Sequence, residues 1–183
     1  MLFIGLEIGS ISLYALAGLN RGDKLSNEAS LKYFLLGSLA SCILIYGVSL
    51  VYVSFSVFSV YNFALGLAYV GPDSVPLTTS IGVLLIFIGL LFKIAAAPFQ
   101  SWAPDVYQGS PTGYVGFMSS IAKASSFIVI ARLCLVSINL IIEDFDIFFL
   151  IVIISSALIG SLFASIQEDL KRLLAYSGVV QSG

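Results

Sequence analysis

The stretch LLFKIAAAPFQSWAPDVYQGSP, residues 90–111, combines a lysine, a proline and a turn-rich tail within a strongly apolar region. The apolar residues at its start predict a helix that crosses a membrane. Proline breaks a helix because it has no N–H donor and its ring clashes with the preceding turn. We therefore expect a break at Pro98 that leaves the carbonyl of Ile94, next to Lys93, without its helical partner. That carbonyl is expected to face protein or water, since an unpaired one is costly in lipid; a kink without function is the alternative.

The composition indicates an integral membrane protein. Hydrophobic residues make up 59% of the 183 residues and charged residues 10%, whereas a soluble domain carries about 25% charged residues. There is no histidine, which argues against zinc, haem and histidine-based catalysis. The net charge of −2 and the scattered basic residues argue against binding to nucleic acid. Cys42 and Cys134 lie in apolar runs and have no spacing typical of a metal site.

The predicted fold class is all-α, a polytopic transmembrane helix bundle formed by a single domain, residues 1–183. A membrane span needs about 20 apolar residues, and the runs that meet this length are 2–19, 32–54, 77–99, 114–137 and 147–166. Residues 170–183 predict a partial helix that is too short to cross. Residues 54–71 follow the second run without a polar break, so they predict an interfacial segment or a loop.

Charges in the connections predict the orientation of the bundle. Arg21 and Lys24 follow the first run, and Lys171 and Arg172 follow the fifth. The connections after the second and fourth runs are acidic instead, with Asp73, Glu143, Asp144 and Asp146. Because basic connections stay on the inner side of a membrane, we expect both basic connections inside, both acidic ones outside, and the N-terminus outside.

Several ionisable residues lie within the apolar runs or at their edges: Glu7, Lys32, Lys93, Lys123 and Arg132. A charge near the centre of a membrane helix costs about 2.5–3.5 kcal/mol, so each of them needs a reason. Arg132 lies close to the outer end of its run, where a long side chain reaches the headgroups. The same interpretation is open for Lys32, at the start of its run.

Glu7, Lys93 and Lys123 are too far from the helix ends for that explanation. At 1.5 Å per residue they lie about 14–20 Å from the inner ends of their runs, so all three are expected near mid-membrane, on three helices. Ionisable groups at this depth are typical of proton pathways. A static structural ion pair is the alternative, but it accounts for Glu7 and one lysine and leaves the other lysine unpaired.

The residues after the expected break are rich in turn formers and aromatic side chains. Trp102, Tyr107 and Tyr114 all fall in this part of the sequence. Since aromatic residues gather at the membrane–water interface, we expect these three to act as interfacial anchors.

The motif around the break also resembles a known family. FKIAAAPFQSWAPDVYQGSPT, residues 92–112, closely resembles the signature of subunit 2 of proton-pumping NADH dehydrogenase, respiratory complex I. The stretches GLEIGSISLYALAG (5–18), SNEASLKYFLLGSLASCILIYG (26–47) and DLKRLLAYSGVVQSG (169–183) agree with it, in order along the chain. The string PDVYQGSPT looks like subunit 2 rather than the related antiporter subunits.

The resemblance implies an antiporter-like fold with one broken helix and a mid-membrane proton relay. By motif, Glu7 matches the acid of the fifth family helix, Lys32 a lysine of the sixth, Lys93 that of the broken seventh and Lys123 that of the eighth. The relay would be coupled to quinone reduction elsewhere in an NADH:ubiquinone reductase. FMN, iron–sulfur clusters and quinone are then expected in other subunits, with no cofactor and no metal in this chain.

The chain departs from the family pattern in length and at three positions. Glu168 and Asp169 stand where neutral residues are more usual, and Gln100 stands where histidine is commoner. Family members have many more spans, in two inverted repeats, so the sequence predicts a short or split form whose remaining helices come from a second polypeptide. The other expected partners are complex I membrane-arm subunits and lipids. The expected location is the mitochondrial inner membrane, with the plastid thylakoid membrane and the bacterial plasma membrane as alternatives.

Two other functions stay open at this point. The first is a subunit of a related monovalent cation/proton antiporter that uses the same glutamate–lysine pair, and the second is a structural membrane-arm piece that no longer conducts protons. The PDVYQGSP signature favours complex I over the antiporter. The lysines argue against the structural piece, because a protein without transport function is stabilised by losing charges from the membrane.

Overall fold

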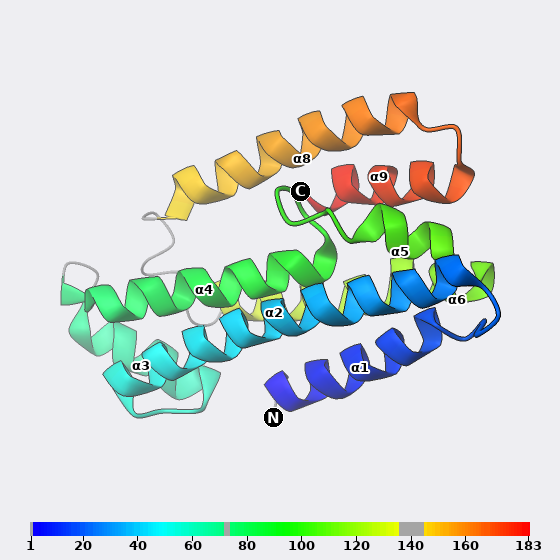
Figure 1. The fold of residues 1–183 in the computed structure, drawn as a ribbon. Helices are drawn as coiled ribbons and strands as arrows, with labels where there is room; N and C mark the ends of the chain where they lie inside the picture. Colours follow the sequence, from blue (N-terminus) through cyan, green and yellow to red (C-terminus); the bar gives the residue numbers. More distant parts are fainter. Residues whose placement is uncertain (1, 72–73, 136–144) are drawn as a thin grey trace.

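The computed structural model describes residues 2–71, 74–135 and 145–183, and within these ranges the chain is helical and has no strand (Figure 1). The helices are α1 Leu2–Ala17, α2 Lys24–Phe55, α3 Val60–Val70, α4 Leu77–Ile94, α5 Ala103–Gly109, α6 Thr112–Phe117, α7 Lys123–Leu133, α8 Asp146–Ile166 and α9 Leu170–Ser182, with a π-helical turn, Met118–Ala122, between α6 and α7. The all-α bundle is therefore confirmed.

Among the described residues, four helices are long and apolar enough to cross a membrane: α2, α4, α8 and the continuous helix Thr112–Leu133. The first predicted span corresponds to α1, which has 16 residues and is shorter than these four. The predicted number of five spans therefore stays a prediction. Residues 54–71, expected as an interfacial segment or loop, contain the 11-residue helix α3. The end of the predicted span 114–137 lies outside the described residues.

The predicted span 77–99 is wrong at its end, because α4 stops at Ile94 and Pro98 lies beyond it in a loop. Ala95 adopts a left-handed conformation with φ 58°. Its N–H donates to the Phe92 carbonyl, and the Ala96 N–H donates to the Leu91 carbonyl. A left-handed residue of this kind ends a helix and pairs its last carbonyls. The helix is thus broken as predicted, but the break begins before the proline.

The elements are arranged as an elongated bundle in which α1, α2 and α4 run side by side and α8 pairs with α9 (Figure 1). α2 and α4 approach most closely at glycines. A Cβ atom added to Gly47 would lie 2.6 Å from the carbonyl oxygen of Gly82, and one added to Gly89 would lie 2.7 Å from Cβ of Leu44. This contact fixes the depth of α4, the helix that carries Lys93, against α2.

The aromatic residues after the break belong to the core and not to an interfacial belt. Trp102 is 2% exposed and Tyr107 is 1% exposed. The Trp102 ring stacks on Tyr33, with 4.7 Å between ring centroids, and its indole N–H donates to the Phe92 carbonyl at 3.0 Å. The expectation of interfacial anchors was wrong for these two, because the chain turns back after α4 and packs its aromatic residues against α2.

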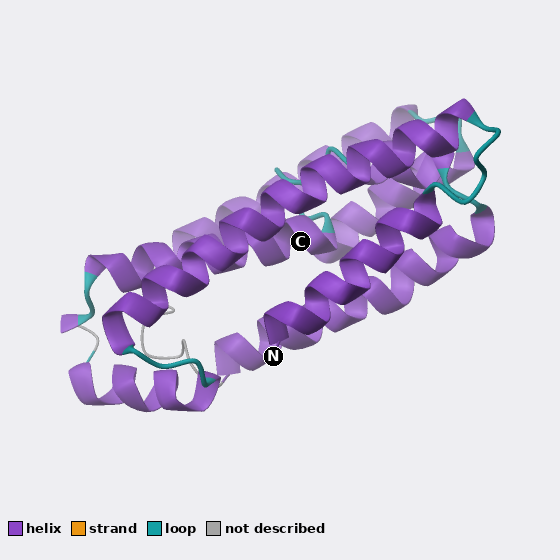
Figure 2. Cartoon of the chain, turned by 60° about the horizontal axis from the view of Figure 1, so that its bottom comes forward, coloured by secondary structure: helices purple, strands orange, loops and turns teal. Residues whose placement is uncertain are grey.

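The connections between α1 and α2 and between α8 and α9 lie at one end of the bundle (Figures 1 and 2), and the basic residues Arg21, Lys24, Lys171 and Arg172 lie within or next to them. At this end Lys24 is the first residue of α2, and Arg172 lies in the first turn of α9. Asp146 is the first residue of α8, which starts at the opposite end. Asp73, Glu143 and Asp144, which complete the expected acidic face, lie outside the described residues. Which side of the membrane each end faces stays a prediction.

Candidate proton-transfer site

A partly buried ion pair joins α1 to α4. The Lys93 ammonium lies 3.0 Å from a carboxylate oxygen of Glu7, although the two residues are 86 positions apart. Lys93 also donates to the hydroxyl of Ser10 at 2.7 Å, and Ser41 of α2 donates to the same Glu7 oxygen at 2.8 Å. The side chains of Lys93 and Glu7 are 10% and 21% exposed. The structure therefore brings the predicted acid and the predicted lysine of the broken helix into direct contact.

Lys93 occupies the last turn of α4, immediately before the break. The carbonyl groups at the end of a helix favour a positive charge, so the break supports the ammonium. Two serines of α8 bind the backbone of Ala97, in the loop after the break. The Ser156 hydroxyl accepts from the Ala97 N–H at 2.9 Å, and the Ser155 hydroxyl donates to the Ala97 carbonyl at 3.3 Å. These two serines satisfy backbone groups that lipid would leave unpaired, and the sequence alone did not single them out.

Lys123 lies in a different environment. It is 9% exposed, at the start of α7, and its ammonium donates to the Gly178 carbonyl and to the Ser182 hydroxyl of α9, both at 3.0 Å. In the described part of the chain no acidic side chain forms an ion pair with it. No hydrogen bond is seen there between Lys93 and Lys123, so transfer from one to the other stays a prediction. Sequence reasoning missed both partners on α9.

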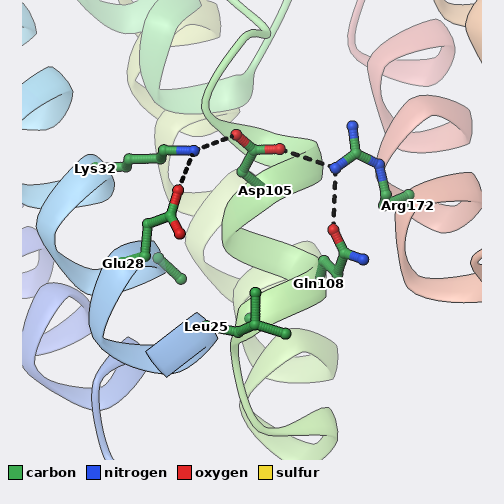
Figure 3. Close-up of a pocket in the computed structure, with 8 residues that line it drawn as sticks. Leu25, Glu28, Lys32, Asp105, Gln108 and Arg172 are labelled. Atoms are coloured by element: carbon green, nitrogen blue, oxygen red, sulfur yellow. Dashed lines mark hydrogen bonds and ion pairs between the residues drawn. The ribbon is translucent and has the colours of Figure 1, made fainter. Parts of the chain in front are cut away.

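Lys32 belongs to a separate cluster at the end of the bundle where the basic connections lie (Figure 3). Its ammonium lies 2.8 Å from Asp105 of α5 and 2.7 Å from Glu28, one turn earlier on α2. The other carboxylate oxygen of Asp105 accepts from Arg172 of α9 at 2.9 Å, and Arg172 also donates to Gln108 at 3.0 Å. The cluster thus ties α5, the segment after the break, to α2 and α9.

Asp105 is the central acceptor of this cluster. Partial burial opposes its ionisation, but the hydrogen bonds and charges of Lys32 and Arg172 outweigh that effect and lower the pKa of Asp105 below its ordinary value of 3.8. A lowered pKa means that the ionised group stabilises the fold above the ordinary pKa and that this contribution is lost as the pH falls through the folded-state value. Near neutral pH the contribution is therefore fully present.

Replacing Asp105 with asparagine is expected to lower the thermal stability of the detergent-solubilised protein at pH 7. The amide is neutral and has an NH2 donor in place of one carboxylate oxygen, so Lys32 and Arg172 can no longer each pair with a negatively charged acceptor oxygen. The difference from the parent protein should shrink as the pH falls below 3.8 and through the lower folded-state pKa of Asp105, where the carboxylate of the parent becomes protonated. Asp146→Asn is the control, since Asp146 is exposed at the start of α8 and forms no ion pair in the described part of the chain. Equal melting temperatures for parent and Asp105→Asn at pH 7 would contradict the assignment.

The remaining expected charge, Arg132, is exposed in the last turn of α7. Its contact with headgroups stays a prediction. Among the described residues no group of three or more His, Cys, Asp or Glu side chains is arranged to hold a metal ion. The expectation of a chain without a cofactor stays a prediction as well.

Taken together, the described residues place one carboxylate and two ammonium groups inside the bundle, on α1, α4 and α7. The carboxylate pairs with Lys93, and Lys123 contacts neutral oxygen atoms instead. Carboxyl and amino groups exchange protons with water, and the helical hydrogen bonding of α4 ends next to Lys93. Chemically, the arrangement suits proton transfer within a membrane.

The family model for NADH:quinone oxidoreductase/Mrp antiporter transmembrane proteins matches residues 1–183. The chain is 43% identical over 182 residues to NADH-quinone oxidoreductase subunit N of Trichlorobacter lovleyi, and the match covers 100% of this chain and 37% of that protein. It is 41% identical over 184 residues to NAD(P)H-quinone oxidoreductase subunit 2 of Trichodesmium erythraeum, covering 100% of this chain and 35% of that protein.

The fold is also similar to a chain of respiratory complex I from Thermus thermophilus. The TM-score is 0.80 at 36% sequence identity, and the match covers 98% of this chain and 37% of that chain. The sequence described here therefore spans little more than a third of the length of these relatives.

Proposed function

Because this chain belongs to the NADH:quinone oxidoreductase/Mrp antiporter transmembrane family, we propose that it acts in the membrane arm of a proton-pumping NADH:quinone oxidoreductase, where its buried glutamate and lysines carry protons. The observation that carries the proposal is the Glu7–Lys93 ion pair, 3.0 Å long and partly buried beside the break after α4. The relatives named above are subunits of NADH-quinone or NAD(P)H-quinone oxidoreductases.

The energetics favour a working site over a static one. Charges inside a membrane cost several kcal/mol each, and one ion pair offsets that cost for Glu7 and Lys93 only. Lys123 is buried without an acidic partner in the described residues. A purely structural role accounts for the pair but not for this second ammonium. A group that gains and loses a proton during turnover accounts for both.

In this proposal Glu7, Lys93 and Lys123 form the mid-membrane part of the proton relay. Lys32, which pairs with Asp105 at one end of the bundle, is its fourth member. The chain contributes to the enzyme as a subunit of an NADH:quinone oxidoreductase, while FMN, iron–sulfur clusters and quinone bind elsewhere in the complex. Its partners are other membrane-arm subunits and lipids. The supply of further helices by a second polypeptide stays a prediction.

The relatives are mostly bacterial, so a bacterial plasma membrane fits them directly. The mitochondrial inner membrane and the thylakoid membrane stay predictions. The multi-pass character itself follows from the family and from four helices of spanning length.

A cation/proton antiporter subunit is the second candidate, because the family model covers both kinds of protein. The buried pair suits either function. The string PDVYQGSPT, which forms α5 and the start of α6, favours the oxidoreductase through its resemblance to subunit 2.

Purification from the native membrane separates the two candidates. We expect the affinity-tagged protein, solubilised in mild detergent, to migrate on native gels with a large complex that oxidises NADH and contains flavin and iron. A membrane preparation without the tag is the control for non-specific capture. Recovery of the protein only in a smaller assembly that lacks flavin and iron, and that exchanges sodium for protons in vesicles, would support the antiporter and overturn the proposal.

A further inference from the structure

Lys93 and Lys123 are held by chemically different partners. A carboxylate accepts hydrogen bonds and cannot donate them, so the Glu7 contact holds Lys93 best while Lys93 carries its proton. A hydroxyl both donates and accepts. The Ser182 hydroxyl, which contacts Lys123 at 3.0 Å, is therefore able to pair with either protonation state of the amine.

The hydrogen bonds can be followed through both states. When Lys123 is charged, it donates to the Gly178 carbonyl and to Ser182, whose own hydroxyl donates to the same carbonyl at 2.5 Å. When Lys123 is neutral, its nitrogen gains a lone pair. Rotation of the Ser182 hydroxyl then turns it into a donor to that nitrogen, while a remaining N–H still donates to Gly178. Neither helix has to move.

The absence of a side chain at Gly178 leaves room for the Lys123 ammonium at the Gly178 carbonyl. A Cβ atom added at Gly178 would lie 3.0 Å from the ammonium nitrogen of Lys123. Any larger residue there crowds the ammonium, which has to shift by a few tenths of an ångström. Residues four positions apart share one face of a helix, so Gly178 and Ser182 together present a carbonyl and a hydroxyl to the one lysine.

We propose that Gly178 and Ser182 form a cradle on α9 that holds Lys123 in both its charged and its neutral state, which makes Ser182 a positioning residue for proton exchange at Lys123. The inference rests on the proposed function and deepens it. It distinguishes how the two lysines are held: Lys93 contacts a carboxylate, which accepts from it while it carries its proton, and Lys123 contacts a hydroxyl, which pairs with it before and after it gives up its proton.

The charged groups on the elements around this site are engaged elsewhere. On α4, Lys93 pairs with Glu7 of α1. On α9, Lys171 donates to the Ser110 carbonyl and Arg172 to Asp105. Tyr176 stacks on Phe163 of α8. Arg132 lies at the far end of α7. A change in pH dependence caused by a substitution at Ser182 is therefore expected to report on Lys123.

The test measures proton translocation against pH in membrane vesicles that contain the assembled complex. In Ser182→Ala both states of the lysine lose a partner, but the charged state loses the stronger, charge-assisted bond. The lysine then binds its proton less tightly, so the alkaline limb of the profile should move to lower pH by about one unit. Ser182→Thr keeps the hydroxyl and should stay close to the parent. Ser177→Ala is the matched control, since the Ser177 hydroxyl donates to the Leu174 carbonyl of its own helix.

An unshifted profile for Ser182→Ala, or an equal shift for Ser182→Thr, would overturn the inference. If Ser182→Ala does not assemble on native gels, Gly178→Ala is the substitute variant. Its Cβ crowds the Lys123 ammonium against the Gly178 carbonyl, so the alkaline limb should move in the same direction. An unshifted profile for that variant overturns the inference too. Lys123→Ala separates the two proposals. Normal translocation in that variant contradicts the proposed function, whereas a defect in Lys123→Ala with no effect at Ser182 or Gly178 contradicts the cradle alone.

Discussion

Replacing Lys93 with alanine is expected to lower proton translocation by about a hundredfold, the lower bound of what one positioned acid–base group contributes, in a complex that still assembles. The substitution removes the ammonium that lies 3.0 Å from Glu7 and leaves the carboxylate without its cation. Electron transfer from NADH should fall with translocation, because the two are coupled in the proposed function. The measurements are NADH oxidation and proton uptake in membrane vesicles, with assembly followed on native gels.

Lys93→Arg should be almost as damaging as Lys93→Ala. Arginine keeps a positive charge next to Glu7, but it does not release its proton under physiological conditions and its planar head needs a different geometry. The charge-conserving variant therefore tests proton exchange rather than charge. Arg132→Lys is the control, since Arg132 is exposed at the end of α7. Normal pumping by a fully assembled Lys93→Ala complex would falsify the relay and favour a structural role.

Replacing Gly47 with leucine is expected to prevent stable packing of α2 against α4. A Cβ atom at this position would lie 2.6 Å from the Gly82 carbonyl oxygen and 2.9 Å from the Ile86 backbone nitrogen. Backbone atoms cannot turn aside as a flexible side chain can, so the helices have to separate. Overpacking typically costs about 1–3 kcal/mol, and a clash with backbone should reach the upper part of that range.

The consequence extends to the ion pair, because α4 carries Lys93 and α2 carries Ser41, the second partner of Glu7. The level of the protein in membranes and its melting temperature in detergent measure the effect. Gly116→Leu is the matched control: it also lies in a spanning helix, and no atom would lie within 4 Å of its added Cβ. Equal loss of protein in the two variants would show that glycine replacement as such, and not the contact between α2 and α4, is responsible.

The sequence predicted the broken helix from local chemistry but misplaced its end. Pro98 kinks or breaks a helix, and this much is encoded in one residue. That α4 stops at Ile94 depends on Ala95 in a left-handed conformation and on bonds from α8 to Ala97, which join residues 58 and 59 positions apart. No pattern near the proline specifies those partners.

The aromatic residues illustrate the same limit. Trp102 and Tyr107 have the composition of an interfacial belt, and the structure buries both. An amphipathic ring suits either location. The turn after the break decides that the rings are buried, because it places Trp102 against Tyr33 of α2 and lets the indole N–H donate to the Phe92 carbonyl.

What the sequence determined by itself is the class of fold and the presence of costly charges. Composition requires a membrane protein, apolar runs of sufficient length require helices, and Glu7, Lys93 and Lys123 stand out because lipid does not tolerate unpaired ions. Only the tertiary structure decided which partners these charges have. In the structure Glu7 pairs with Lys93, and Lys123 donates to the Gly178 carbonyl and the Ser182 hydroxyl. The reason is physical: depth along a helix follows from counting residues, whereas the side chain opposite depends on how helices far apart in sequence rotate and pack.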